Sequence, residues 1–141
     1  MSSATPADVL ARRRHLTLTG DADGLADLYA PDAVIESPFA GQSGMPARLE
    51  GREAIRAYTR QVMASPLRLE DYEVTELYQT QDPEVVIAEV RGKATVTTTG
   101  RSFTTTSIQI LRIRDGHIVL FRDYANPRIL EDLTGDPRPE S

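Results

Sequence analysis

The feature that most constrains the fold is the segment from residue 101 to residue 127, which reads RSFTTTSIQILRIRDGHIVLFRDYANP. It predicts two strands joined at Asp115-Gly116, because Asp-Gly adopts the positive φ angles of a two-residue hairpin turn. β-Branched and aromatic residues dominate both strands, as a half-buried pleated surface requires. One face of the first strand carries Phe103, Thr105, Ser107, Gln109, Leu111 and Ile113. On the second strand, one face carries Val119, Phe121, Asp123 and Ala125, and the other Ile118, Leu120, Arg122 and Tyr124.

Length and composition exclude several classes of protein. The chain has 141 residues, which predicts a single domain over residues 1–141 with an ordered core at about residues 7–133. Its net charge of −5 argues against nucleic acid as the main partner, and the run Arg12–Arg14 is interpreted as a solvated helix face. There is no cysteine, and no apolar run approaches the ~20 residues of a membrane span. The first residues lack the pattern of a secretion signal, so we expect a cytoplasmic protein.

Helical patterns precede the long strands. Thr5 and Pro6 predict the start of a helix that ends at Gly20, and a second, short helix follows from Asp21 to the Pro31-Asp32 pair. We then expect a short strand at 33–37, a loop at 39–51, and a third helix at 52–65. The loop is either a mobile lip over a pocket or an ordinary surface connection. Strands are expected at 69–80 and 84–98, and a last helical turn at 129–133.

This order predicts an α+β domain. Consecutive strands joined by short turns form an antiparallel meander, and helices gathered before them must cover one face of that sheet. We therefore expect a cone-shaped α+β barrel, in which a curved antiparallel sheet wraps over three N-terminal helices. The space between sheet and helices is the natural ligand pocket.

Three stretches carry a family resemblance: GDADGLADLYAPDAVIESPF, LEGREAIRAY and ILRIRDGHIVLFRDYANP. Together they resemble the nuclear-transport-factor-2-like superfamily, which includes ketosteroid isomerase and SnoaL-like polyketide cyclases, over roughly residues 7–133. The resemblance implies a curved antiparallel sheet, three helices, a deep pocket and commonly a homodimer formed through the outer sheet face.

The resemblance also tests one specific reaction. In ketosteroid isomerase a catalytic base follows the Glu of the YAPDAVIE-like stretch, and here that position is Ser37. The positions of its two oxyanion-hole residues fall near Arg13 and on Gln109. Ser37 without an adjacent base cannot abstract a carbon-bound proton, so steroid isomerisation by that mechanism is not expected.

A closer resemblance links YQTQDPEVVIAEVRGKATV and FRDYANP to the phenazine-biosynthesis A/B proteins and other SnoaL-like proteins. In that group an acidic residue just after the Arg of this ending is proposed as acid/base, and Asp123 occupies the position. The group's functional His on the third helix corresponds to Tyr58. The carboxylate is therefore kept while its partner is changed.

The candidate site residues come from separate elements. Asp123 and Gln109 interrupt an apolar strand face, and a carboxyl facing an apolar cavity would be pushed toward its protonated form, which suits general acid/base chemistry. The alternative for Asp123 is an ion pair with Arg122 or Arg128. Tyr58 either donates to a substrate oxygen or fills the core. The expected catalytic residues are Asp123 and Tyr58, and the expected substrate-binding residues are Gln109, Phe121, Ser37, Glu36 and Tyr29, with one of Glu36 and Ser37 pointing inward.

The predicted function is a cofactor-free isomerase, cyclase or dehydratase that acts on a small, apolar, oxygenated metabolite. His15 and His117 do not form a metal pair, and no phosphate-binding loop or nucleophile elbow is present, so no metal or cofactor is expected. The alternative is a non-catalytic binding or dimerisation module of the same fold. Apolar residues on the outer sheet face, Ile108, Ile110, Leu120 and Tyr124, predict a homodimer.

Overall fold

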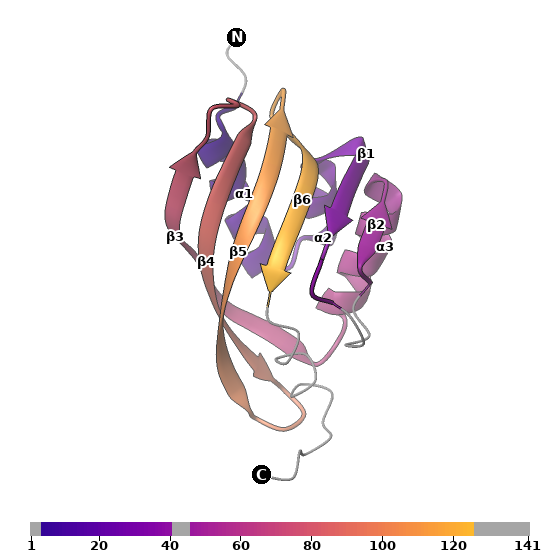
Figure 1. Cartoon of the computed structure of the whole chain (residues 1–141). Coiled ribbons are helices and arrows are strands. Elements are labelled where there is room, and N and C mark those ends of the chain that lie inside the picture. The colour runs from indigo at the N-terminus through magenta and orange to yellow at the C-terminus, as the bar shows by residue number, and fades with distance from the viewer. Residues whose placement is uncertain (1–3, 41–45, 126–141) are drawn as a thin grey trace.

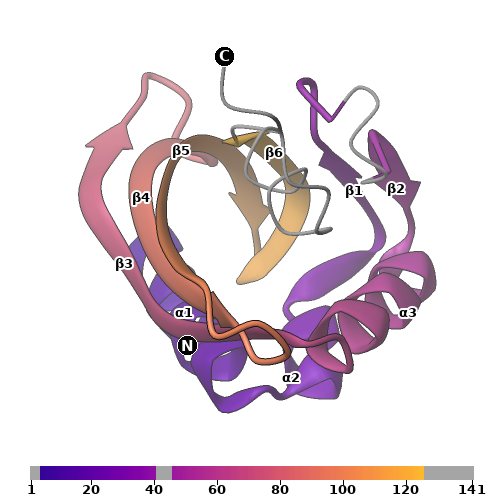
Figure 2. The same ribbon diagram turned by 90° about the horizontal axis from the view of Figure 1, so that it is seen from below.

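A six-stranded curved sheet and three helices make up the computed structural model, which describes residues 4–40 and 46–125. The sheet is curved, and the helices cover its concave face (Figures 1 and 2). The helices are α1 (Pro6–Thr19), α2 (Ala22–Asp27) and α3 (Arg52–Met63). The strands are β1 (Tyr29–Glu36), β2 (Arg48–Glu50), β3 (Leu67–Gln79), β4 (Val85–Val96), β5 (Ser102–Arg114) and β6 (His117–Ala125). This architecture confirms the predicted cone-shaped α+β fold.

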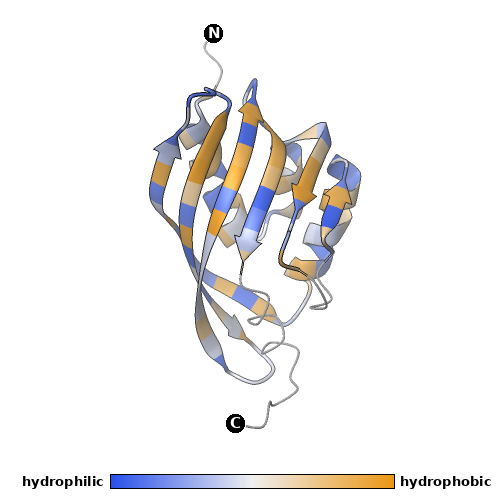
Figure 3. Cartoon of the chain, in the orientation of Figure 1, coloured by the Kyte–Doolittle hydropathy of each residue, from blue (hydrophilic) through white to orange (hydrophobic). Residues whose placement is uncertain are grey.

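The strand order is β2-β1-β6-β5-β4-β3. Neighbouring pairs from β3 to β6 are antiparallel, as the meander predicted, and β1 pairs with β6 in parallel. Exposure alternates from residue to residue along β5, a strand that carries both polar and apolar bands in Figure 3. The inward row on β4 and β5 is buried, with Val86, Ala88 and Leu111 each 0% exposed. This alternation turns one face of the sheet toward the helices.

The ends of α1 follow the local sequence signals. The Thr5 side chain accepts from the backbone N–H of Asp8, and the Asp8 carboxylate accepts from the backbone N–H of Thr5, which forms a complete capping box. Gly20 ends the helix in the left-handed conformation. Val9, Leu10 and Leu16 are buried against the sheet in the main core. Among the described residues, no helix is both long and apolar enough to cross a membrane.

The turn between β5 and β6 is the predicted one. Asp115 has φ 53° and Gly116 has φ 77°, so both central residues adopt the positive φ angles of a type I′ hairpin turn. The turn sets the register in which Gln109 lies opposite Asp123 and Leu111 opposite Phe121.

The predicted faces of β6 are wrong at its start. Strict alternation assigned Ile118 to the outer face, but Ile118 is 0% exposed and lies in the main core. The register between β5 and β6 shifts at this point: Arg112 pairs with Leu120 and Ile113 with Ile118, so Val119 is an extra residue. This β-bulge inverts the pattern for the first residues of the strand only. From Leu120 onward the predicted alternation holds, and Phe121 and Asp123 face inward.

The start of β1 also differs from the prediction. We expected Pro31-Asp32 to end a helix and a strand to begin at residue 33, but α2 ends at Asp27 and β1 begins at Tyr29. The pairing with β6 is irregular between Tyr29 and Val34, and Pro31 lies in that gap. Proline has no backbone N–H to donate to a neighbouring strand, so a strand can contain a proline where its pairing is irregular.

The segment after β1 is only partly a loop. Arg48–Glu50, expected to be irregular, forms β2 and pairs antiparallel with β1. Residues 41–45, which carry much of the predicted lip, and the helical turn predicted at 129–133 lie outside the described residues.

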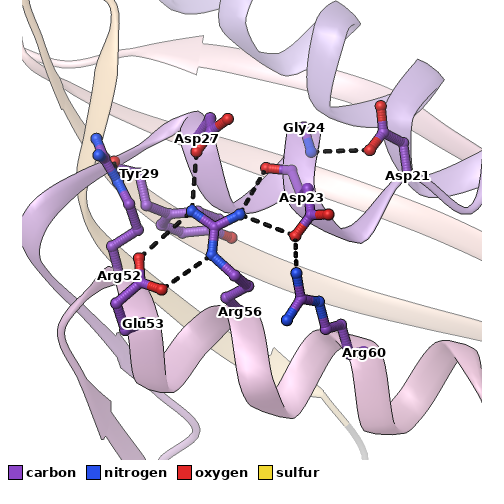
Figure 4. A network of polar contacts seen from close by, with 9 residues as sticks. All are labelled: Asp21, Asp23, Gly24, Asp27, Tyr29, Arg52, Glu53, Arg56 and Arg60. Carbon is purple, nitrogen blue, oxygen red and sulfur yellow. Dashed lines mark hydrogen bonds and ion pairs between the residues drawn. The ribbon is translucent and has the colours of Figure 1, made fainter.

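An ion-pair network fixes α3 against α2 (Figure 4). The Arg56 guanidinium contacts Asp23 at 2.9 Å, Asp27 at 3.0 Å and Glu53 at 3.1 Å. Arg60 also pairs with Asp23. These carboxylates hold the pKa of Arg56 above its ordinary value, with Glu53 contributing most. The network anchors the helix that carries Tyr58.

Candidate functional site

A cavity of about 540 Å³ lies between the inner face of the sheet and the helices. Apolar side chains from several elements form part of its wall, among them Leu25, Ile35, Leu49, Val62, Met63 and Phe121. Polar side chains also reach it, among them Arg13, Tyr29, Ser37, Tyr58 and Asp123. A cavity of this size, with a few polar groups in an apolar wall, has the form of a small-molecule site.

Asp123 lies on β6, directly opposite Gln109 on β5, and lines the cavity. Its Oδ1 atom is buried and has no hydrogen-bond partner among the described residues. Burial raises the pKa of the Asp123 carboxyl above its ordinary value; the charge of Arg13 and the hydroxyl of Ser107 act in the opposite direction without reversing the shift. The site thus holds a carboxyl with one free oxygen and an increased affinity for a proton.

Arg13 reaches the cavity from α1. Its guanidinium lies 4.3 Å from the centre of the Phe121 ring, a cation–π contact. Nη1 donates to the Tyr72 hydroxyl at 2.7 Å, and Nε donates to the Tyr29 hydroxyl at 3.4 Å. The arginine is therefore held by phenol oxygens and aromatic rings. Its positive charge interacts electrostatically with the carboxyl of Asp123.

Tyr72 links Arg13 to the sheet. While its oxygen accepts from Arg13, its hydroxyl donates to Oε1 of Gln109 at 3.0 Å. Gln109 is 3% exposed, so this amide is a buried anchor. The chain of contacts runs from α1 through β3 to β5 and ends beside Asp123 in the β5–β6 register.

The structure places five of the seven predicted site residues in the cavity wall. They are Asp123, Tyr58, Phe121, Ser37 and Tyr29. Tyr58, half-buried on α3, has a pKa that burial raises above its ordinary value. Ser37 is 8% exposed and Tyr29 is 1% exposed. The site therefore collects side chains from β1, α3 and β6.

The other two predicted residues have other partners. Gln109 accepts a hydrogen bond from the Tyr72 hydroxyl and is not one of the residues found in the cavity wall. Glu36 forms ion pairs with Arg122 at 3.0 Å and with Arg48 at 3.2 Å. Its neighbours Ile35 and Ser37 line the cavity, so strand alternation turns Glu36 to the opposite face. Of the pair Glu36 and Ser37, Ser37 is the one that points inward. Arg122, considered as an alternative partner of Asp123, is bound to Glu36, and Arg128, the other alternative, lies outside the described residues.

Sequence reasoning missed Arg13 and Tyr72. The run Arg12–Arg14 was interpreted as a solvated face, but Arg13 lies three residues after Leu10 and three before Leu16, both buried. Spacing of three and four residues puts a side chain on one helix face. This spacing, together with the resemblance that aligned Arg13 with an oxyanion-hole position, was a usable signal. Tyr72 gave no signal, because its role depends on a contact 59 residues away in sequence.

Metal ligation has no support in the described residues, where no cluster of three or more His, Cys, Asp or Glu side chains could hold an ion. The arrangement can instead move a proton at Asp123 and stabilise a negative oxygen at Arg13.

Comparison with known proteins gives a consistent picture. Residues 12–121 match the model of the SnoaL-like domain. An uncharacterised PhzA/B-like protein of Pseudomonas aeruginosa is 39% identical, with 91% of this chain and 89% of that protein covered. The crystal structure of an isomerase candidate from Bacillus subtilis superposes with a TM-score of 0.84 at 30% identity, covering 91% of each chain.

A more distant structure shares the fold alone. It is a hypothetical protein from Catenulispora acidiphila with a ketosteroid-isomerase-like fold, in complex with trimethylamine. It has a TM-score of 0.70 at 20% identity and covers 86% of each chain.

Proposed function

The chain belongs to the SnoaL-like family, and from this premise we propose that it is a cofactor-free isomerase, cyclase or dehydratase. Its substrate is a small apolar metabolite that carries oxygen functions, and Asp123 is the general acid/base. Arg13 and Tyr58 bind the substrate oxygen. The similarity to an isomerase candidate from Bacillus subtilis supports this reaction class.

The proposed chemistry begins with a C–H bond next to a carbonyl group. The Asp123 carboxylate takes the proton, and the electron pair of the C–H bond moves onto the carbonyl oxygen to give an enolate. The Arg13 guanidinium and the Tyr58 hydroxyl stabilise that negative charge. Where a C=C bond is conjugated with the enolate, protonated Asp123 returns the proton to the far carbon of that bond, which completes an isomerisation. Where a hydroxyl group lies β to the carbonyl, Asp123 gives the proton to that leaving hydroxyl, which completes a dehydration and releases water. Both routes regenerate the carboxylate.

The observation that carries this proposal is the free Oδ1 of Asp123. A buried carboxyl oxygen without a partner is unfavourable unless a ligand uses it. Ion pairs occupy Glu36 and Glu84, whereas Asp123 keeps an open position within a cavity. A raised pKa also brings the carboxyl closer to the range in which it can both take and give a proton.

The alternative is a module that only holds a ligand. A cavity filled by side chains would favour that interpretation, whereas open space of about 540 Å³ beside an unpartnered carboxyl favours the enzyme. The two differ in one measurable property: only the enzyme exchanges substrate protons.

Hydrogen exchange into candidate substrates tests the proposal and does not require that the product be identified. We would incubate the protein in D₂O with a panel of apolar cyclic ketones, enones and β-hydroxyketones and follow deuterium incorporation by NMR. Asp123→Asn should reduce the rate for any active compound by about 100- to 10,000-fold. Glu84→Gln is the control, since Glu84 pairs with Arg112 and Arg114 away from the cavity. Equal rates for Asp123→Asn and wild type would exclude Asp123 as the acid/base.

We also propose a homodimer formed through the outer sheet face. Ile108 is 48% exposed there, and Tyr124, its partner in register, packs against Phe39 at 5.5 Å between ring centres. Exposed apolar side chains gathered on one face favour association. Light scattering should give twice the chain mass of 15.6 kDa. Ile108→Asp should give the monomer mass, while Thr104→Asp, on the same strand and face, should not. A monomeric wild type at micromolar concentration would contradict the proposal.

A further inference from the structure

Arg13 and Asp123 are opposite charges in the wall of one cavity, yet they do not form an ion pair. The two groups interact electrostatically, but no nitrogen of Arg13 lies within the 4.0 Å of a salt bridge to Asp123 among the described contacts, and Oδ1 of Asp123 has no partner. Opposite charges at a buried site ordinarily pair, because the contact offsets part of the hydration that each has lost. We therefore looked among the contacts of Arg13 for a restraint that keeps its guanidinium from Asp123.

The contacts of Arg13 identify what holds it. Its shortest hydrogen bond, 2.7 Å, goes to the Tyr72 hydroxyl, whereas the bond to the Tyr29 hydroxyl is 3.4 Å and weaker. The Phe121 ring supports the guanidinium at 4.3 Å but does not fix its direction within the ring plane. Tyr72 is thus the strongest directional restraint on the arginine.

Tyr72 is itself fixed from the strand next to Asp123. Its hydroxyl donates to Gln109 Oε1 at 3.0 Å, and Gln109 is the residue opposite Asp123 in the β5–β6 ladder. Because Gln109 is 3% exposed, water has little access to compete for this bond. The anchor of Tyr72 and the carboxyl therefore lie on one pair of neighbouring strands, β5 and β6.

We infer that Tyr72, anchored by Gln109, is a positioning residue that holds the Arg13 guanidinium away from Asp123 and so keeps a carboxyl oxygen free for a ligand. An ion pair with Arg13 would keep the carboxylate ionised and occupy its free oxygen, and the site would lose its proton-transfer group. The relevance to catalysis rests on the proposed function, but the restraint is measurable without any substrate.

Titration of the Asp123 carboxyl by NMR on protein with ¹³C-labelled aspartate tests the inference, with Asp123→Asn used to assign the signal. In Tyr72→Phe the arginine loses its main restraint and moves to Oδ1, so the pKa of Asp123 should fall below its wild-type value. In Arg13→Met it should rise, because the substitution removes a cation that lowers the pKa of this carboxyl. Arg68, which also lines the cavity, is kept in both variants, so its charge does not account for a difference between them.

The double variant separates positioning from a direct effect of Tyr72. Adding Tyr72→Phe to Arg13→Met should leave the titration of Asp123 unchanged, because Tyr72 acts only through Arg13. Tyr29 and Tyr58 also line the cavity and are kept in every variant, so any effect they have on the pKa of Asp123 is the same in all of them. Tyr78→Phe is the matched control: it removes a hydroxyl from the same strand, but one that donates to Glu89 on the exposed side. It should not alter the pKa of Asp123.

Two results would overturn the inference. One is an unchanged titration of Asp123 in Tyr72→Phe; the other is an equal decrease with and without Arg13. If Tyr72→Phe does not fold, as judged by circular dichroism, Gln109→Leu provides a second test that leaves the tyrosine in place but removes its anchor. The titration does not depend on turnover, so a failure here is distinguishable from a failure of the catalytic proposal.

Discussion

Two arginines, Arg13 on α1 and Arg56 on α3, occupy opposite electrostatic environments. The Arg56 side chain is 17% exposed and contacts three carboxylates, those of Asp23, Asp27 and Glu53. Arg13 hydrogen-bonds two phenol oxygens, lies against aromatic rings, and forms no ion pair among the described contacts. One guanidinium joins two helices, and the other presents its charge to a cavity.

Arg56 has a structural role, whereas the charge of Arg13 is available to a ligand. The surrounding carboxylates neutralise the positive potential of the Arg56 guanidinium, and this network contributes to the packing of α2 on α3 (Figure 4). A guanidinium held only by neutral groups retains its positive potential, which a substrate oxygen can use. Replacing each arginine with methionine, which keeps the length of the aliphatic chain, should therefore have opposite consequences.

The largest expected difference is in activity. Arg13→Met removes the group that stabilises the enolate and should reduce kcat/KM, or the rate of substrate deuterium exchange, by about 100- to 1,000-fold. Arg56→Met should change the same rate by less than about threefold, because its contacts lie outside the cavity wall. Similar losses in the two variants would show that the arginines do not differ in this way.

Thermal stability should show the opposite ranking of the two variants, with the larger decrease in Arg56→Met. Arg56→Met leaves three carboxylates without their shared partner and should lower Tm by about 5 °C. Arg13→Met separates no carboxylate from a hydrogen-bond partner and should shift Tm by less than about 2 °C. Calorimetry measures both, and 1 M salt should reduce the Arg56 effect by screening. A larger decrease for Arg13 than for Arg56 would contradict the comparison.

A smaller effect should appear in the pH dependence of stability, where two carboxyls differ as the arginines do. Arg114 and Arg112 lower the pKa of Glu84 to about 2. Its contribution to stability is therefore complete above the ordinary pKa of 4.5 and is lost as the pH falls toward 2. The raised pKa of Asp123 has the opposite sign: stability is greatest below 3.8 and declines as the pH rises through the folded-state pKa.

Urea midpoints measured from about pH 2 to about pH 7 check this prediction. At neutral pH, Glu84→Gln should be slightly less stable than wild type, and Asp123→Asn should be more stable. Both differences should disappear in acid, where the carboxyls are protonated in the folded and unfolded chains alike. Since the Glu84 side chain is partly exposed, its effect should be small and sensitive to salt. Differences of the same sign for the two variants would refute the assignment.

Most of the fold could be predicted from the sequence. The Asp115-Gly116 turn, the cap at Thr5 and the alternation along β4 and β5 are local patterns, and each is present where expected. The inward position of Asp123 followed from the same alternation. The sequence-based predictions failed where a strand departs from regular alternation or pairing. The bulge at Val119 buries Ile118, and β1 contains Pro31, which was expected to lie before the strand.

The amino-acid sequence by itself determined which side chains share a face, because strand and helix periods depend only on neighbours along the chain. Only the tertiary structure decided the partners across the cavity. Arg13, Tyr72 and Gln109 come from three elements, and their contacts depend on how the sheet curves over α1. The free oxygen of Asp123 is likewise a result of long-range packing, since it reflects where a guanidinium from the first helix is held. Local patterns thus placed the carboxyl, and distant contacts left it available.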